Sequence, residues 1–148
     1  MDALDILGQM HVEAKAAFEE IESASAEERG DLWDKLEPQL ALHEDLEERF
    51  VYDPVSRDAG GRDAVLAAWE EEHEAQVAEA ESVMAAIDAL EPTDDAWLSQ
   101  VAALHQTLEG HIAHEEDDIW PRIREVWGEG RLEEVGETMD QAKKAAKA

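Results

Sequence analysis

The chain contains no cysteine. Disulfide bonds, zinc–thiolate sites, iron–sulfur clusters and cysteine nucleophiles are therefore excluded as the basis of its stability or its chemistry. If the chain binds a transition metal, imidazole and carboxylate side chains must supply the ligands.

Basic residues are also scarce: the chain has 12 lysines and arginines in total, compared with 39 aspartates and glutamates. The formal net charge of −27 should repel nucleic acid and anionic membrane surfaces, so we expect neither as a partner. The acidity is compatible with a surface adapted to saline surroundings, and equally with ordinary helix surfaces in an Ala-, Glu- and Asp-rich chain.

Long apolar runs are missing as well, and no segment is long enough to span a bilayer. The N-terminal ten residues, MDALDILGQM, are acidic and lack the basic start of a signal peptide. We therefore expect a soluble, cytoplasmic protein. Its 148 residues, 44% of them apolar, suffice for one domain with a buried core.

Runs of β-branched residues are scarce, whereas alanine, leucine and glutamate dominate, which is a composition typical of helices. Apolar residues recur at helical spacing along the chain. The pattern predicts four long helices, over residues 3–21, 25–52, 64–90 and 93–120, and a short helix from residue 131 on.

Capping and turn residues indicate where these helices begin and end. Ser25 followed by Glu28 forms a capping-box pattern, and Thr93 is the predicted N-cap of the fourth long helix. We expect Pro38 to kink or interrupt the second helix and Pro121 to disturb the end of the fourth. The turn-forming stretch DPVSRDAGGRD should link the second helix to the third.

Short connections between long helices favour antiparallel neighbours. We therefore expect an all-α protein: an antiparallel up-down-up-down four-helix bundle over residues 1–127, and a C-terminal helix over residues 128–148 that packs on the bundle or extends from it. The five tryptophans should belong to the core, where large residues at helical spacing usually lie.

Two segments, in the predicted second and fourth helices, repeat each other. His43 is followed four residues later by Glu47, and His111 is followed in the same way by Glu115. In both segments a second glutamate, an aliphatic residue and an aromatic residue come next at matching offsets. Because a spacing of four residues places both side chains on one helix face, each segment can present an imidazole and a carboxylate to the interior of a bundle.

The other two long helices each carry one histidine near their middle, His11 and His73. Four helices would thus contribute four imidazoles and two carboxylates. This is a symmetric set for two metal ions, with a carboxylate free to bridge them. Such ligands suit iron, and manganese or zinc less specifically.

The order His, His-x-x-x-Glu, His, His-x-x-x-Glu resembles the hemerythrin/HHE cation-binding family over roughly residues 5–127. Members of this family hold an oxo- or hydroxo-bridged di-iron centre, and they bind dioxygen, sense oxygen or iron, or handle peroxide or nitric oxide. The resemblance implies two iron ions, with bridging carboxylates from Glu47 and Glu115. It implies these terminal ligands: His11, His43, His73 and His111.

The sequence departs from the oxygen carriers of that family at Val77, where those carriers have a second histidine one turn after the position of His73. Glu44, directly after His43, could fill the gap as a metal ligand, as a glutamate does in some family members. Otherwise the position is open to water or a small ligand. Either arrangement weakens the case for reversible oxygen carriage and favours sensing or redox chemistry.

The ligand pattern supports three functional hypotheses. In the first, a di-iron site binds or senses dioxygen, or senses iron. In the second, the same site is that of an enzyme acting on hydrogen peroxide, dioxygen or nitric oxide. In the third, the bundle binds zinc or no metal and serves in protein contacts. The sequence leaves open whether the protein is an enzyme, and it does not indicate an oligomeric state.

A ferritin-like di-iron site is the obvious competitor, but it uses a repeated Glu-x-x-His motif. Only Glu70 and His73 fit that motif here, and it is not repeated, so this alternative is set aside. The other polar residues near the motifs are assigned to solvated faces or to positions beside the ligands: His105, His114, Glu48 and Glu116.

Overall fold

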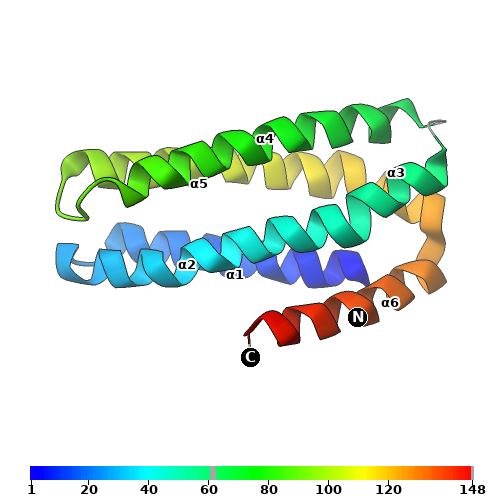
Figure 1. Cartoon of the computed structure of the whole chain (residues 1–148), viewed down its shortest axis with the longest axis horizontal. Helices are drawn as coiled ribbons and strands as arrows, with labels where there is room; N and C mark the ends of the chain where they lie inside the picture. The colour runs from blue at the N-terminus through cyan, green and yellow to red at the C-terminus, as the bar shows by residue number, and fades with distance from the viewer. Residues whose placement is uncertain (61–62, 148) are drawn as a thin grey trace.

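The computed structural model describes residues 1–60 and 63–147, and the long helices form the predicted antiparallel bundle (Figure 1). In Figure 1 helices α4 and α5 lie as one pair over the pair formed by α1 and α2. The bounds of these four helices are α1 Ala3–Ser23, α2 Ala26–Glu47, α4 Ala64–Asp88 and α5 Asp95–His114.

Side-chain caps explain where two of these helices begin. The Asp2 carboxylate accepts a hydrogen bond from the backbone N–H of Asp5, at 2.9 Å, and opens α1. Asp63 accepts from the backbone N–H groups of Val65 and Leu66 and opens α4. Such caps satisfy backbone donors that have no partner within the helix.

Two cap predictions need correction. Ser25 is the N-cap residue of α2 as predicted, but its side chain forms no capping hydrogen bond, so the capping box with Glu28 is not made. The N-cap of α5 is Asp94 and not Thr93, because Asp94 has the extended backbone conformation that precedes the first helical residue.

The predicted link between the second and third helices is largely helical, which is a further correction. The chain leaves α2 through a π-helical turn, η1 (Glu48–Tyr52), and continues as α3 (Asp53–Ala59). Pro54 lies at the start of α3, directly after the π-helical turn. Gly60, with φ of 61°, ends α3 in the left-handed conformation. Residues 61–62 of the predicted link lie outside the described residues.

Pro38 and Pro121 lie within helical backbone and have different surroundings. Helix α2 passes through Pro38 without interruption. The predicted fourth helix ends as α5 at His114, and the chain continues through a second π-helical turn, η2 (Glu115–Ile119), into α6 (Trp120–Lys147). Pro121 therefore directly follows a π-helical irregularity within continuous helical backbone, as its expected disturbance of the helix predicts.

Helix α6 turns back on the bundle at Gly128, whose backbone is not helical (φ 74°, ψ 171°). Its C-terminal part then runs beside the N-terminal end of α1, below the bundle in Figure 1. Leu132 and Met139 are fully buried there. Gly136 is required at the crossing, because a Cβ atom would lie 2.5 Å from the carbonyl oxygen of Met1. The division of the chain into a bundle over residues 1–127 and a C-terminal helix over residues 128–148 stays a prediction.

The core consists of two apolar clusters, one toward each end of the bundle. The tryptophan prediction holds for Trp33, Trp69, Trp97 and Trp120, which are all buried, whereas Trp127 is only partly buried. Five polar or charged residues are also buried among the described residues: Asp2, His11, Glu47, His73 and Glu115. Four of these five are predicted metal ligands, and burial of such groups is costly unless a partner compensates it.

Candidate metal centre

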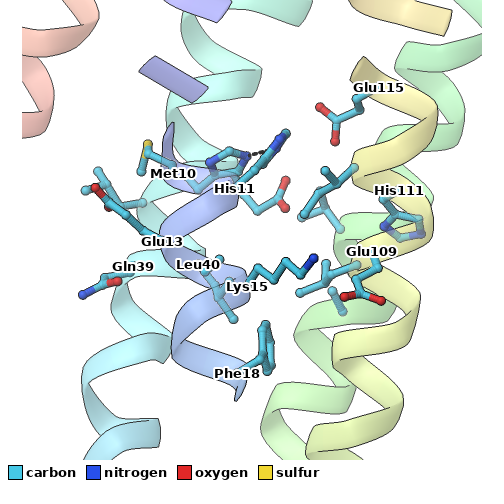
Figure 2. Close-up of a pocket in the computed structure, with 18 of the residues that line it drawn as sticks. Met10, His11, Glu13, Lys15, Phe18, Gln39, Leu40, Glu109, His111 and Glu115 are labelled. Atoms are coloured by element: carbon cyan, nitrogen blue, oxygen red, sulfur yellow. Dashed lines mark hydrogen bonds between the residues drawn. The ribbon is translucent and has the colours of Figure 1, made fainter. Parts of the chain in front are cut away.

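The first group of candidate ligands joins α1 to α2. The Nε2 atoms of His11 and His43 lie 3.1 Å apart, and Glu47 Oε2 lies 3.0 Å from His43 Nε2. The three residues offer ligand atoms that all lie within 4.8 Å of one another. In Figure 2 the dashed line beside His11 marks the contact between the two imidazoles.

The second group joins α2 to α4. His73 Nε2 lies 3.2 Å from Glu44 Oε2 and 3.5 Å from Glu47 Oε1. Glu44, Glu47 and His73 again place ligand atoms within 4.8 Å of one another. The two groups therefore share Glu47, and its two carboxylate oxygens face different imidazoles. A carboxylate in this position is suited to bridge two cations.

The spacing of these atoms fits metal ligation. Metal–ligand bonds of about 2.1 Å at right angles put neighbouring ligand atoms about 3.0 Å apart, close to the separations in both groups. Glu44 Oε2, Glu47 Oε1 and His11 Nδ1 are buried and have no hydrogen-bond partner among the described residues. Such atoms are costly to bury, and cations at the two groups would satisfy the two carboxylate oxygens.

Burial and mutual charge shift the pKa values strongly. Burial lowers the pKa of His11 to about 4, and the neighbouring His43 acts in the same direction. Burial opposes charge on His73 too, but its contacts with the Glu44 and Glu47 carboxylates raise its pKa to about 11. Burial and the negative charge of Glu47 raise the pKa of Glu115 well above its ordinary value. Perturbation of this kind is typical of functional sites.

The comparison with known proteins agrees with this geometry. Residues 2–145 match the family described as Hemerythrin HHE cation binding domain. The chain belongs to this family. No protein with a curated description matches the chain. A crystal structure of a hemerythrin HHE cation-binding domain-containing protein from Mycobacterium kansasii is similar, with a TM-score of 0.82 and 25% sequence identity. The match covers 99% of this chain and 87% of that one.

The predicted family and fold are thus confirmed, and the His/Glu groups of this HHE domain fit cation binding. None of its helices, over the residues that the structure describes, is both long enough and apolar enough to cross a membrane.

Two carboxylates assigned to solvated faces in fact contact the candidate ligands. Glu48 Oε2 lies 3.0 Å from His73 Nδ1, where it can accept a hydrogen bond and leave Nε2 free for a cation. Glu116 Oε1 lies 3.6 Å from His11 Nδ1, which is longer than a hydrogen bond. Partners of this kind orient the imidazoles that ligate metals. The sequence feature that marks these two contacts is the second glutamate of each repeated motif, Glu48 and Glu116.

Glu115 is held by a hydrogen-bonded chain formed by Tyr52 and Trp120, the aromatic residues of the two repeated segments. The buried Tyr52 hydroxyl donates to Glu115 Oε2 at 2.6 Å, and the Trp120 indole N–H donates to the Tyr52 oxygen at 3.2 Å. The Trp120 ring also stacks on His11, with centroids 5.1 Å apart and an interplanar angle of 11°. These aromatics come directly after the two repeated motifs, so the repeat supplies both the ligands and their supports.

The structure brings neither His111 nor Glu115 into either group. The His111 imidazole is half-buried, and the His111 ring lies well apart from the His11 ring in Figure 2. His111 nevertheless lines the same cavity as His73 and Glu44, and its pKa is lowered by burial.

Both π-helical turns begin at or directly after a carboxylate of the repeated motifs. Turn η1 starts one residue after Glu47, and η2 starts at Glu115. A π turn inserts one extra residue and rotates the rest of the helix by about 100°. This rotation accompanies the inward placement of Tyr52 and Ile119, which are both buried. Such turns are frequent at functional sites.

Proposed function

We propose that this HHE domain holds two iron ions bridged by carboxylates and that the centre binds or senses dioxygen. The observation that carries the proposal is the shared Glu47, whose two oxygens face two separate ligand groups. Iron bound there supplies a site at which a small ligand can attach and exchange electrons. The proposed ligands are His11, His43, Glu44, Glu47, His73, His111 and Glu115.

Each proposed residue has a distinct task. His43 and His73 each contact the other two members of their ligand group. Glu44 supplies an oxygen near the place where oxygen carriers of the family have a histidine. Glu115 would provide the second bridging carboxylate, and the hydrogen bond from Tyr52 holds its orientation. His111, which lines the same cavity, would complete the set.

A redox enzyme acting on hydrogen peroxide, dioxygen or nitric oxide is the second candidate. The observation in its favour is Val77, which lines the cavity together with His73 and Glu44. A valine cannot ligate, so this side of the site leaves room for a substrate beside the proposed ligands. The enzyme hypothesis requires repeated turnover, whereas binding or sensing requires only reversible attachment.

Metal analysis and anaerobic spectroscopy test the first proposal. We expect about two irons per chain after anaerobic reconstitution, and a visible absorption band that develops with oxygen and disappears on deoxygenation. The variant Glu47→Gln should lose the band, and Glu79→Gln, an exposed glutamate of α4, is the matched control. A protein that cannot be reconstituted with two irons contradicts the proposal.

Turnover separates the two candidates. Many cycles of peroxide or nitric oxide consumption, abolished in Glu47→Gln and retained in Glu79→Gln, would establish the enzyme. A single oxidation without turnover would favour binding or sensing.

A further inference from the structure

We propose that the groove between α2 and α4 binds an aliphatic diamine or polyamine, with its ammonium groups at carboxylates on the groove rim and its alkyl chain on the apolar floor. The two principal carboxylates, Glu74 and Glu81, are not proposed metal ligands, so binding there does not depend on iron. The inference therefore goes beyond the proposed function.

The groove lies on the side of the bundle where the helices are least closely packed. Helix α1 packs along α2 and α5, and α4 packs along α5, whereas α2 and α4 approach each other less closely. In Figure 1, α2 lies below α4 along the length of the bundle. The groove between these two helices has a volume of about 340 Å³, which is ample for a small organic molecule.

The floor of the groove is apolar, and α5 closes it from below. Leu104 of α5 is buried there, and Leu108 is half-buried. Burial of methylene groups against such a floor is favourable, so an alkyl chain is a suitable occupant. The apolar residues that α2 and α4 add to it are Leu40, Val77, Ala80 and Met84.

The rim of the groove carries one sign of charge only. Among the described residues no lysine or arginine lines it, and five carboxylates do: Glu44, Asp45, Glu48, Glu74 and Glu81. Three other hollows of the molecule each include at least one basic residue, namely Lys15, Arg131 and Arg124. The excess of acidic residues in the chain therefore does not make every hollow purely acidic, and the charge of this one favours a cation.

Two of these carboxylates, Glu74 and Glu81, form no ion pair with residues 1–60 or 63–147, whereas the other three each contact His73 or Arg49. Glu74 and Glu81 lie on one face of α4, two turns apart, which is about 10 Å along the helix axis. Val77 of the floor lies between them in the sequence. Two ammonium groups joined by an apolar chain match this arrangement.

The spacing distinguishes such a ligand from simpler cations. A hydrated metal ion gains nothing from the apolar floor, and a monoamine reaches only one of the two carboxylates. A diamine of matching length uses both. Its second contact forms within a molecule that is already bound, so this contact costs less entropy than a separate binding event.

Calorimetric titration of the metal-free protein with four probes tests the proposal, at an ionic strength of about 0.15 M to screen general attraction to the acidic surface. The probe 1,8-diaminooctane has two charges and a long body, octylamine has one charge, 1,3-diaminopropane has two charges and a short body, and octane-1,8-diol has no charge. We expect saturable binding of 1,8-diaminooctane, about 10-fold tighter than that of octylamine or 1,3-diaminopropane, and none of the diol.

Matched variants locate the binding. Glu81→Gln keeps the shape of an exposed side chain and removes one of the two charges, so it should weaken 1,8-diaminooctane about 10-fold, to near the affinity of octylamine. Glu74→Gln should act in the same way. Glu79→Gln removes the same charge from an exposed position of α4 outside the groove and should have little effect. Circular dichroism establishes that each variant is folded.

Three outcomes overturn the inference: no saturable binding of 1,8-diaminooctane, equal binding of 1,3-diaminopropane, or equal affinity in Glu81→Gln and the unaltered protein. An equal loss in Glu79→Gln also overturns it, because the ligand would then respond to total charge and not to the groove. Diamine binding by protein that cannot be loaded with iron would support the inference while contradicting the proposed function. Iron loading without diamine binding would contradict the inference alone.

Discussion

Glu47 combines complete burial with a carboxylate that faces two imidazole groups at once. Burial alone would raise its pKa, but the adjacent His43 lowers it well below the ordinary value, so the carboxylate is ionised. An ionised buried carboxylate is stabilised by cations, and the nearby histidines do this only in part.

Replacing Glu47 by glutamine keeps the shape of the side chain and removes its charge. We expect iron content to fall from about two per chain to one or fewer, because both proposed positions lose an oxygen ligand. Elemental analysis after anaerobic reconstitution measures this. Retention of both irons would show that Glu47 does not bridge them.

Glu48 should matter for metal affinity although it is not a proposed ligand. It contacts His73 Nδ1 at 3.0 Å and thereby fixes the ring with Nε2 toward Glu44 and Glu47. We expect Glu48→Gln to weaken metal binding by about 10- to 100-fold, the range found for partners of ligating imidazoles. Competition with a chelator of known affinity measures it. Asp45→Asn, an exposed neighbour, removes the same charge and should have little effect.

Metal loading should release protons. In the absence of metal, His73 has a pKa of about 11, and the pKa of Glu115 lies well above its ordinary value. A ligating imidazole must be neutral and a bridging carboxylate must be ionised, so both protons leave on loading. Affinity should therefore fall as the pH falls. Titrations in two buffers of different ionisation enthalpy count the protons, and Glu115→Gln should release fewer.

The residue pattern predicted the proposed ligands because the four-residue spacing defines one face of a helix. His43 and Glu47 share a ligand group, as that spacing predicts, whereas Glu115 is buried but neither it nor His111 lies in a group. The contacts of Glu48 and Glu116 could not be predicted in this way. Each of them is turned by about 100° from its motif glutamate and reaches a histidine on a neighbouring helix, which depends on how the helices pack.

At the scale of helices, composition and periodicity predicted the four long helices well and their ends less well. Turn-forming residues at 53–59 suggested a link, but tertiary packing makes them helical, with Val55 completely buried. The π-helical turns carry no clear local signal. They arise where the chain must present a glutamate and then an aromatic residue to the same interior.

The C-terminal part of α6 offers a test of how closely this element packs on α1. A methyl group at Gly136 would lie 2.5 Å from Met1 O and 2.9 Å from Ala3 N, and backbone atoms cannot yield cheaply. We expect Gly136→Ala to lower the free energy of unfolding by about 1–3 kcal/mol. Thermal or urea unfolding measures it.

Gly130 provides the control on the same helix. A Cβ atom there meets nothing within 4 Å, so Gly130→Ala should be neutral or should stabilise by up to about 1 kcal/mol. Equal effects of the two substitutions would show that α6 does not dock at Gly136.

At the scale of the whole molecule, the bundle holds a net charge of −27 in a compact body. The charge follows directly from the sequence, and the sequence predicted the architecture. Whether the acidity is an adaptation to salt is a separate question. The answer depends on how stability responds to salt, because salt shortens the distance over which charges repel each other. Self-repulsion between separated carboxylates is screened when the Debye length falls to about 8 Å, near 0.15 M salt.

Salt titration of the thermal unfolding midpoint separates the two explanations. If the acidity acts only by self-repulsion, the midpoint should rise from about 0.01 M to about 0.15 M sodium chloride and then level off. The variant Glu19→Gln/Glu71→Gln/Glu133→Gln removes three exposed charges, from −27 to −24, and should start higher and rise less steeply. A midpoint that keeps rising into molar salt, in both proteins alike, would contradict self-repulsion and favour a surface adapted to saline surroundings.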